Sequence, residues 1–466
     1  MASIHDLSPS ISTLPTLRLS IEEAVTGAGG HVQQKNLSAS KKVLGMPVII
    51  GAMVLDIHAV PFAADLQRGT TVPGKVTYVQ GGVGRNVAEC ITKLGVPAFL
   101  ISVVGQDMAG QLLVAHWLSL GLSIEGVQQC AECVTPVVSA VFDTKGELAT
   151  AVADVTALEE HMTPKWICQF VDIIQSAPVM MVDANLMPNV LEAACSLARE
   201  ANVPIWFEPV SVPKSVRATG LLKYITFASP NKAELISMAE NLTCSVKGMM
   251  SQGSLSTKTG SARVKEIVWK LRHHIYVLLA TGMKYIVLTL GKHGVVLCST
   301  RNNPMFQDSL GQMDLSSDAD GGTTFDAIPV AAILSRAIAS SLTETSSDGI
   351  SSNVTNTQTN IFEFPNDSYE PPHVQNAVQS EPKVMCVHLP ALPSTVVSLS
   401  GAGDCLVAGT MAALSGNCDL VRSLAYGVAV ARLAVQSDSN VPECFSRNSI
   451  SDDVQFVMSQ TQVFHI

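Results

Sequence analysis

Short, almost purely apolar runs recur along this chain, separated by segments with helical spacing. The first lies at residues 48–55, and others follow at 98–104, 179–182, 205–207, 224–228 and 286–290. Strands buried on both faces have this composition, whereas half-exposed strands alternate apolar and polar residues. We therefore predict a three-layer α/β/α fold with a mostly parallel central sheet. Ligands of such folds bind beyond the carboxyl ends of the strands, so functional residues are expected just after the runs.

Two segments have a different pattern. Residues 71–80 and 137–152 alternate apolar and polar side chains, and the second contains the turn pair Lys145-Gly146. This is typical of a small antiparallel sheet with one solvated face. We expect these segments to form a β flap, or lid, from about 57–82 and 135–155.

Composition limits the kinds of partner. Hydrophobic residues make up 47% of the chain and charged residues 15%, against a usual charged share of about 25%, so a large core is expected. The net charge of −10 and the lack of a basic cluster disfavour a nucleic-acid polymer as partner. The longest apolar stretch is well short of the roughly 20 residues that span a bilayer, so no membrane partner is expected.

The chain divides into a main domain, two polar segments and a tail. Residues 1–45 are rich in Ser and Thr and lack an apolar signal core, so we expect a disordered extension and no secretory signal. The main domain should span 46–445, with a low-complexity insertion at 301–381 that holds one apolar stretch, 328–342. Residues 446–466 form a C-terminal tail. A cytoplasmic location is the default expectation, with a mitochondrial one as the weaker alternative.

The eleven cysteines are scattered, and the C-x-x-C pair Cys130/Cys133 has no second pair or histidines at zinc-ligand spacing. A structural role for reduced thiols is the simpler interpretation.

The strongest local motif is the run Ser400-Gly401-Ala402-Gly403-Asp404, followed by small apolar residues at 405–414. Glycines at a helix start let backbone N–H groups approach an anion, and the helix N-terminus adds positive potential. Asp404 could then accept a proton from a hydroxyl beside a held phosphoryl group. The alternative is a plain glycine turn in which Asp404 only caps the helix.

A second glycine-rich segment, residues 81–86, reads Gly-Gly-Val-Gly-Arg-Asn and leads into a helix closed by Gly95. Asn86 offers donors and an acceptor to sugar hydroxyls. The segment is not a Walker A loop, because no Gly-Lys-Ser/Thr closes it. Taken alone it could be an ordinary strand-to-helix turn.

Together, these motifs resemble the two signatures of the PfkB carbohydrate kinases, a family with the ribokinase-like fold. The resemblance implies that Asp404 is the catalytic base and that the N–H groups of Gly401, Ala402 and Gly403 hold the γ-phosphoryl of ATP. It also implies that the substrate is bound by a set of residues near the first strand: Asp56, Gly81, Gly82 and Asn86.

Two further motifs resemble ATP-binding parts of the family. Residues 231–234 match N-x-x-E, which implies that Asn231 and Glu234 organise Mg²⁺ and phosphate, with Glu234 acting through water. Residues 289–294 match the T-x-G-x-x-G turn, which implies nucleotide contacts from Thr289, Gly291 and Gly294. Asp107, in a G-x-D-x-x-G segment, is interpreted as a helix cap.

Within the family, residues 81–89 are most similar to the pseudouridine kinases, as are the surroundings of Asp154 and Asn185. The implied reaction is ATP-dependent phosphorylation of the 5′-hydroxyl of pseudouridine, giving pseudouridine 5′-phosphate and ADP. For Asp154 and Asn185 the alternative to substrate contact is capping or turn formation. Alternatives for the whole chain are a kinase of adenosine, ribose or a ketohexose, or a catalytically idle scaffold.

Departures from the family pattern affect cations. Ser398 and Leu399 replace the Asp-Thr pair that helps bind a monovalent cation in many members, so we expect weak dependence on K⁺. Glu208 stands where many members have Asp. Because exposed edges of a flap tend to pair, we also expect a homodimer formed through the lid.

Overall fold

A computed structural model describes residues 45–63, 69–144, 148–242, 260–300 and 384–466, all in a compact unit that spans Leu44–Ile466. The predictions for the N-terminal extension up to residue 44 and for the insertion at 301–381, including the stretch 328–342, fall outside the described residues. Within the described ranges, no helix is long and apolar enough to cross a membrane.

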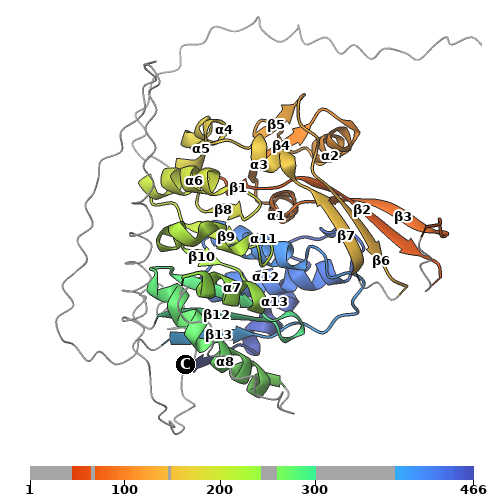
Figure 1. Ribbon diagram of the computed structural model, residues 1–466. Coiled ribbons are helices and arrows are strands. Elements are labelled where there is room, and N and C mark those ends of the chain that lie inside the picture. The colour runs from red at the N-terminus through yellow and green to blue at the C-terminus, as the bar shows by residue number, and fades with distance from the viewer. Residues whose placement is uncertain (1–44, 64–68, 145–147, 243–259, 301–383) are drawn as a thin grey trace, which may run out of the picture. The chain divides into compact units, whose positions relative to one another are not determined.

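The larger sheet has ten strands in the order β14-β13-β12-β11-β10-β9-β8-β1-β4-β5 (Figure 1). The strands from β11 to β5 in this order run parallel, and β12, β13 and β14 are added antiparallel. Their bounds are β1 Val48–Ile50, β4 Phe99–Gly105, β5 Val127–Cys130, β8 Met180–Asp183, β9 Ile205–Glu208, β10 Phe227–Ala228, β11 Tyr285–Thr289, β12 Val295–Thr300, β13 Val384–Leu389 and β14 Gln462–His465.

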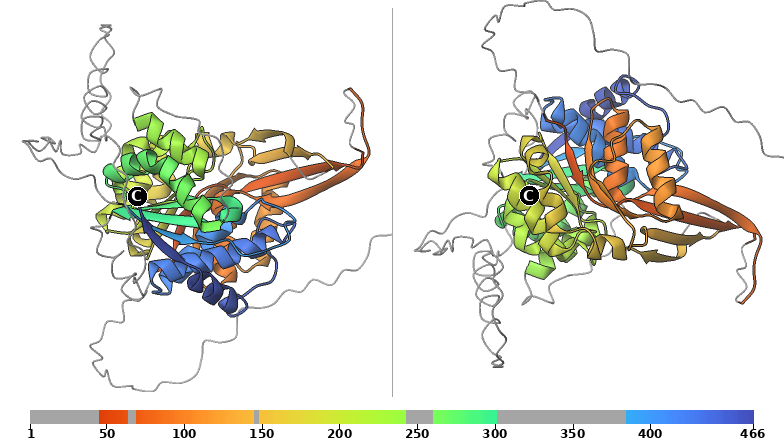
Figure 2. Two further views of the ribbon diagram at one scale, coloured as in Figure 1. Left: turned by 90° about the horizontal axis from the view of Figure 1, so that it is seen from below. Right: turned by 90° about the horizontal axis from the view of Figure 1, so that it is seen from above.

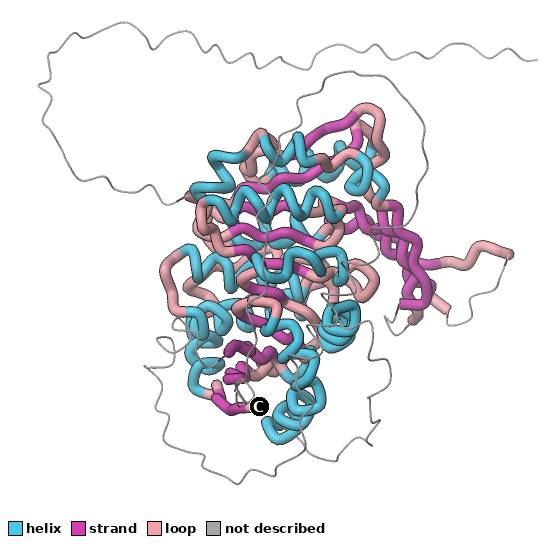
Figure 3. The backbone as a smooth tube through the Cα atoms, turned by 60° about the vertical axis from the view of Figure 1, so that its left-hand side comes forward, coloured by secondary structure: helices cyan, strands magenta, loops and turns pink. Residues whose placement is uncertain are grey.

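Helices cover both faces of this sheet (Figure 3). Alternate strand residues enter different cores: Val48 and Ile50 pack in one apolar cluster, and Ile49 packs in the other. The first cluster includes α3 Thr156–Glu160, α4 Pro164–Cys168, α5 Val171–Ser176, α6 Pro188–Glu200, the 3₁₀ segment Ser215–Tyr224, α7 Lys232–Leu242 and α8 Gly260–Ala280. The second includes α1 Val83–Lys93, α2 Met108–Ser119, α11 Ala402–Ser415, α12 Leu420–Val435 and α13 Ser451–Ser459. The predicted three-layer α/β/α fold is confirmed.

A second sheet of four strands forms the lid, in the order β3-β2-β6-β7. Its strands are β2 Val54–Pro61, β3 Gly74–Gly81, β6 Val137–Phe142 and β7 Leu148–Asp154. They extend away from the larger sheet (Figure 2). The predicted β flap is therefore present. Its strands β3, β6 and β7 come from the two segments that alternate apolar and polar residues, whereas β2 begins within the first apolar run.

The prediction of one strand across residues 48–55 is wrong. The run breaks after β1, and β2 already belongs to the lid. Between them, the N–H of Ala52 donates to Asp183 Oδ2 at 2.9 Å, and the carbonyl of Ala52 accepts from the backbone N–H of Arg85. These polar groups are satisfied by the ends of β8 and α1 instead of a neighbouring strand. An apolar pattern alone does not reveal such a change of partner.

Two other segments differ in detail from the sequence-based description. Residues 224–228 contain only the short strand β10, because the preceding residues form the 3₁₀ segment that ends at Tyr224. The tail at 446–466 contains α13 and β14, and β14 pairs with β13 at the edge of the larger sheet.

Candidate active site

Several polar residues, most of them singled out in the sequence, gather beyond the carboxyl ends of the parallel strands. Asp183 ends β8, Glu208 ends β9, and Thr289 ends β11. Asn231 follows β10 and forms a parallel bridge with Thr289. The first turns of α1 and α11 lie side by side at this edge, since Asn86 on α1 hydrogen-bonds to Asp404 on α11. This is where parallel α/β sheets bind ligands.

Asp404 lies in the first turn of α11, and Asn86 lies in the first turn of α1. Nδ2 of Asn86 donates to Oδ2 of Asp404 at 2.6 Å, across 318 residues of sequence. Burial raises the pKa of Asp404 to about 6, and the charges of Asp183 and Asp56 add to the rise. The Asn86 hydrogen bond and the Arg85 charge oppose it. A carboxyl with this pKa is suited to accept a proton near neutral pH.

The loop before α11 is shaped for a close backbone approach. Gly401 is the N-cap residue, with a left-handed φ of 76°. A side chain there would overlap the carbonyl oxygen of Asn440, whereas a methyl group on Gly403 would meet no atom within 4 Å. The start of α11 therefore has open space beside Gly403, where an anion could be bound near the first N–H groups of the helix.

Asp56, on lid strand β2, belongs to the same cluster. Its carboxylate accepts a hydrogen bond from Nδ2 of Asn440 at 3.1 Å, and that amide also donates to the carbonyl of Gln80 at 3.0 Å. Burial raises the pKa of Asp56, although the Asn440 hydrogen bond works against it. Gly81 leaves the space that the carboxylate fills, since a Cβ at Gly81 would collide with Asp56. Gly82, with φ of 92°, is the N-cap of α1.

Asn231 and Glu234 form a capping box at the start of α7. The side-chain oxygen of Asn231 accepts from the N–H groups of Ala233 and Glu234 at 2.9 and 3.0 Å, and Oε2 of Glu234 accepts from the N–H of Asn231 at 2.8 Å. The N-x-x-E motif thus has a structural role in starting the helix. Any part it takes in binding a metal comes in addition to that role.

Glu208 brings a further carboxyl to this edge. Burial raises its pKa well above the ordinary value, and the charges of Asp404 and Glu234 raise it further, despite a hydrogen bond from Ser229. Carboxyl groups that oppose each other's ionisation are relieved by a bound cation. In the described part of the chain, however, no three His, Cys, Asp or Glu side chains are close enough to hold a metal ion directly. Contact with a metal through water fits this arrangement better.

The T-x-G-x-x-G segment forms the turn between β11 and β12. Gly291 and Gly294 have φ of 55° and 84°, and a side chain on Gly294 would overlap the carbonyl of Leu389. The N–H of Thr289 donates to the carbonyl of Pro230 at 3.0 Å, which holds this turn beside Asn231. The structure thus brings together the segments expected to bind ATP.

Asn185 is buried at the end of β8 and is part of a charged cluster. Its Oδ1 accepts from Nζ of Lys214 at 2.7 Å, and its N–H donates to Asp183 at 3.0 Å. Burial raises the pKa of Asp183 and lowers that of Lys214. This cluster adjoins β1, because Asp183 also accepts from the N–H of Ala52.

Asp154 and Asp107 make local hydrogen bonds, the first in a turn and the second as a helix cap. Asp154 is exposed at the end of β7, where it accepts from the N–H and hydroxyl of Thr156 at 3.1 and 2.8 Å. Asp107 is the N-cap of α2 and accepts from Gly110 and Thr135. The capping interpretation of Asp107 is confirmed. In this conformation Asp154 is not drawn into the cluster around Asp404.

Cys130 and Cys133 remain free thiols. The Sγ of Cys130 lies 3.6 Å from Nδ1 of His161, and the Cys133 thiol faces the carbonyl of Cys130. Burial raises the pKa of Cys133 to about 12, so this thiol stays protonated and unreactive at neutral pH.

Comparison with known proteins agrees with this geometry. Residues 46–309 and 374–443 match the pfkB family carbohydrate kinases. The chain belongs to this family. It is an alcohol-group phosphotransferase that uses ATP and a small-molecule substrate, and the ribokinase-like character predicted from its motifs is confirmed.

Individual members of the family and individual solved structures can also be compared with this chain. The chain is 39% identical over 420 residues to a pseudouridine kinase of Arabidopsis thaliana, covering 90% of this chain and 98% of the relative. It is 30% identical over 248 residues to a pseudouridine kinase of Escherichia coli strain K12, covering 53% and 71%. The ribokinase of Arabidopsis thaliana, solved with ribose and ATP, superposes with a TM-score of 0.57 at 16% identity, covering 89% of this chain and all of that one.

Several residues of this pfkB-family site were not assigned a role from sequence. Asp183 and Glu208 end strands, a position that could have marked them. Lys214 and Asn440 had no such signal in the sequence. Lys214 does not directly follow a strand, and Asn440 lies 36 residues after Asp404 with no glycine motif beside it. Only the folded chain shows that they reach the site.

The two glycines of the α11 loop provide a test that separates folding from function. Gly401→Ala should destabilise the protein by about 1–2 kcal/mol or more, since its φ is left-handed and its side is filled. Gly403→Ala should leave stability unchanged or slightly raised, because alanine favours helix. Its methyl group should still lower turnover, on the order of 10²-fold, by obstructing an N–H donor. Thermal unfolding and ATP-dependent turnover measure the two effects. Normal turnover in Gly403→Ala would exclude phosphate binding on this side of α11.

Proposed function

We propose that this chain transfers the γ-phosphoryl group of ATP to the 5′-hydroxyl of pseudouridine. The observation that carries the proposal is the Asn86–Asp404 hydrogen bond, which joins the two family signatures into one site with a carboxylate poised near neutral pH. The choice of pseudouridine is supported by the Arabidopsis relative, whose similarity extends over nearly its whole length.

Asp56 and the Gly81-Gly82 turn would hold the ribose, with Asn86 next to them. The ribose 5′-hydroxyl would then face Asp404, which accepts its proton as the oxygen attacks the phosphoryl group. The N–H groups of Gly401, Ala402 and Gly403 would stabilise the charge that develops on the phosphoryl oxygens. In such reactions the protein contributes mainly positioning and electrostatic stabilisation.

Magnesium bound to ATP would neutralise the phosphate charge. Glu234 and Glu208 are the residues suited to hold its water ligands, since burial raises the pKa of both carboxyl groups and the charge of Glu234 raises that of Glu208 further. Weak dependence on K⁺ also remains part of the proposal. Ser398, in place of the family Asp, supplies no carboxylate, and its hydroxyl accepts from the N–H of Ser400 at 3.1 Å within the loop.

Selection of the base would depend on its glycosidic bond. Pseudouridine is joined to ribose through carbon, which leaves an N1–H donor that uridine lacks. Asn185 could accept this hydrogen, since a carbonyl oxygen has two lone pairs and Lys214 uses one of them. Asp154, on the lid, could do so after the lid closes. A buried group left unpaired by the wrong substrate is the usual source of strong discrimination.

Replacing the base tests the chemistry. Asp404→Asn should lower kcat by about 10²–10⁴-fold, the usual range for loss of a general base. Wild-type kcat/KM should fall as the pH drops through about 6, because protonated Asp404 cannot accept a proton. The free energy of unfolding should depend on pH in the opposite sense. Because the pKa of Asp404 is raised in the folded state, its carboxyl stabilises the fold below about pH 4, and this contribution is lost as the pH rises through about 6. A variant with near-normal turnover would contradict the role of Asp404.

A substrate panel tests the specificity. With ATP and Mg²⁺, kcat/KM for pseudouridine should exceed that for uridine, adenosine, ribose and fructose by at least about 100-fold, since one buried hydrogen bond can discriminate by more than this. Pseudouridine and uridine should be supplied together, with both 5′-monophosphates measured. Equal consumption of uridine or a free sugar would reject pseudouridine as the preferred substrate but leave the kinase assignment intact. No turnover of any member would favour an idle scaffold.

We also propose a homodimer through the lid. Tyr78, Ile57, Ser139 and Val152 lie opposite one another across the four strands, so their side chains share one face. Asp56 is in the next row and points to the other face. On the Tyr78 face, Val76, Tyr78 and Val152 are 59%, 63% and 73% exposed. A second copy of this lid has the apolar surface needed to cover them.

The double variant Tyr78→Asp/Val152→Asp places charge on this face and should convert a wild-type dimer into a monomer. Trp269→Asp, at an exposed site on α8, serves as the control and should stay dimeric. Sedimentation velocity across a range of concentrations measures both. A monomeric wild type, or a dimeric double variant, would reject the lid interface.

A further inference from the structure

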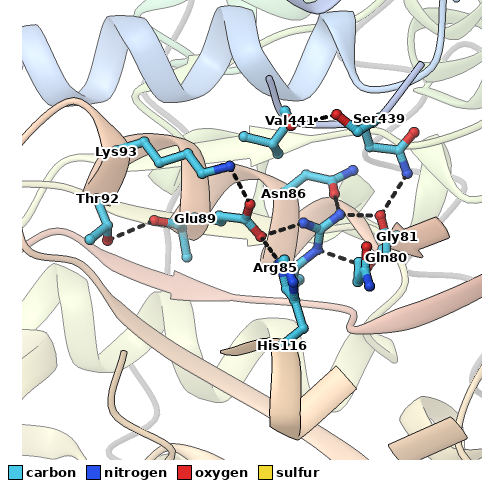
Figure 4. A network of polar contacts seen from close by, with 12 residues as sticks. Gln80, Gly81, Arg85, Asn86, Glu89, Thr92, Lys93, His116, Ser439 and Val441 are labelled. Atoms are coloured by element: carbon cyan, nitrogen blue, oxygen red, sulfur yellow. Dashed lines mark hydrogen bonds and ion pairs between the residues drawn. The ribbon is translucent and has the colours of Figure 1, made fainter. Parts of the chain in front are cut away.

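Arg85 is buried to 2% exposure in the first turn of α1 and uses its guanidinium in several directions. Nε donates to the carbonyl of Gly81 at 3.2 Å, and Nη1 donates to Oε2 of Glu89 at 2.6 Å. Nη2 donates to the carbonyl of Gln80 and to Oδ1 of Asn86. Figure 4 shows the guanidinium between Glu89, the end of β3 and the amide of Asn86.

The contact with Asn86 fixes which end of that amide faces the catalytic carboxyl. A guanidinium only donates hydrogen bonds, so the group that faces it must be the amide oxygen. The nitrogen of Asn86 is then directed to Asp404, where it donates to Oδ2. With the amide reversed, two donors would meet at Arg85 and two acceptors at Asp404. We propose that Arg85 is a positioning residue that fixes the Asn86 amide so that Asp404 is held as an ionised proton acceptor.

Glu89 holds Arg85 in place. Its carboxyl is also 2% exposed and binds Lys93 at 2.8 Å and His116 at 3.0 Å. Burial alone would raise the pKa of Glu89, but the His116 hydrogen bond and the charges of Arg85 and Lys93 lower it well below its usual range. The ion pair of Arg85 and Glu89 therefore stays charged, and its four-residue spacing keeps it on one side of α1.

The same guanidinium connects the lid to this amide. Gln80 and Gly81 end β3, and the carbonyl of Gln80 accepts from both Arg85 and Asn440. Asn440 in turn donates to Asp56, on the neighbouring strand β2. Arg85 thus positions the catalytic pair and the root of the lid with a single rigid planar group. Lysine offers one point charge and cannot reproduce this fork.

The test uses the intact chain and separates positioning from folding. Arg85→Met alone leaves Glu89 buried beside Lys93 and His116, which would disturb folding. The double variant Arg85→Met/Glu89→Leu removes both buried charges, and such replacements usually keep or improve stability. Thr92→Ala, on the same helix, is the control, because its hydroxyl bonds only to the carbonyl of Ala88 in this region.

The double variant should unfold near the wild-type temperature and still lose about 10²-fold in kcat, as expected when reacting groups are misplaced. KM for ATP should change little. The acid limb of kcat/KM should move to higher pH, since Asp404 would lose both its oriented donor and the nearby Arg85 charge, which lowers its pKa, while Asp56, Asp183 and Glu208 still face it and His58 stays beside Asp56. Arg85→Lys, which keeps the charge, separates the two contributions. Thr92→Ala should retain wild-type kinetics and the wild-type pH profile.

Normal kcat with an unchanged pH profile in a folded double variant would overturn the positioning role. Should that variant fail to fold, Arg85→Lys decides. Lysine keeps the positive charge but not the fork of donors. Wild-type kcat and a wild-type pH profile in Arg85→Lys would therefore reject the role of Arg85 in orienting Asn86, whereas a folded, slow variant with a shifted acid limb would support it.

The inference rests on the proposed kinase reaction, so all variants are assayed with the best substrate of the panel. A wild type that phosphorylates nothing would reject the proposed function. An active wild type with an unaffected double variant would reject only the role of Arg85.

Discussion

A carboxylate partly withdrawn from water at the start of α11 is the constraint on which the rest of the site depends. Burial makes Asp404 basic enough to accept a proton near neutral pH, but an ionised buried carboxyl needs a donor that is held in place. Asn86 is that donor. Its helix, α1, is seated against the turn after β1, because Gly84 has no side chain to separate the helix from Gly51. The turn after β1, α1 and α11 are therefore organised around one hydrogen bond.

Much of the fold could be predicted because its cause is local in sequence. Apolar runs and alternating segments reflect how many faces of a strand are buried, and they gave the layers and the lid. The exit from β1 could not be predicted in this way. Residues 48–55 are uniformly apolar, and the strand ends only because Ala52 finds hydrogen-bond partners in Asp183 and Arg85. Those partners are set by tertiary structure.

The residues of the site can also be divided into those that could be predicted from the sequence and those that could not. Gly401 and Asp404 could be found because backbone conformation and helix position demand particular residue types there. Arg85 belongs to a motif that the sequence shows. Its partner Glu89, and the contact of Glu89 with His116, could be recognised only once α1 was placed beside α2. Asn440 carries no local signal and is defined by what it touches, namely Asp56 and Gln80. The residues proposed to bind a ligand are marked by a sequence pattern, whereas those that hold them in position are not.

The distance along the chain between Asn86 and Asp404 has a consequence for synthesis of the protein. A ribosome completes the segments proposed to bind the sugar, and the lid, long before it reaches α11, so a nascent chain lacks the proposed base and the helix start proposed to bind phosphate. Asn440, which supports Asp56, is made later still. On the proposed mechanism, an interrupted chain could not consume ATP, and only a nearly complete chain could.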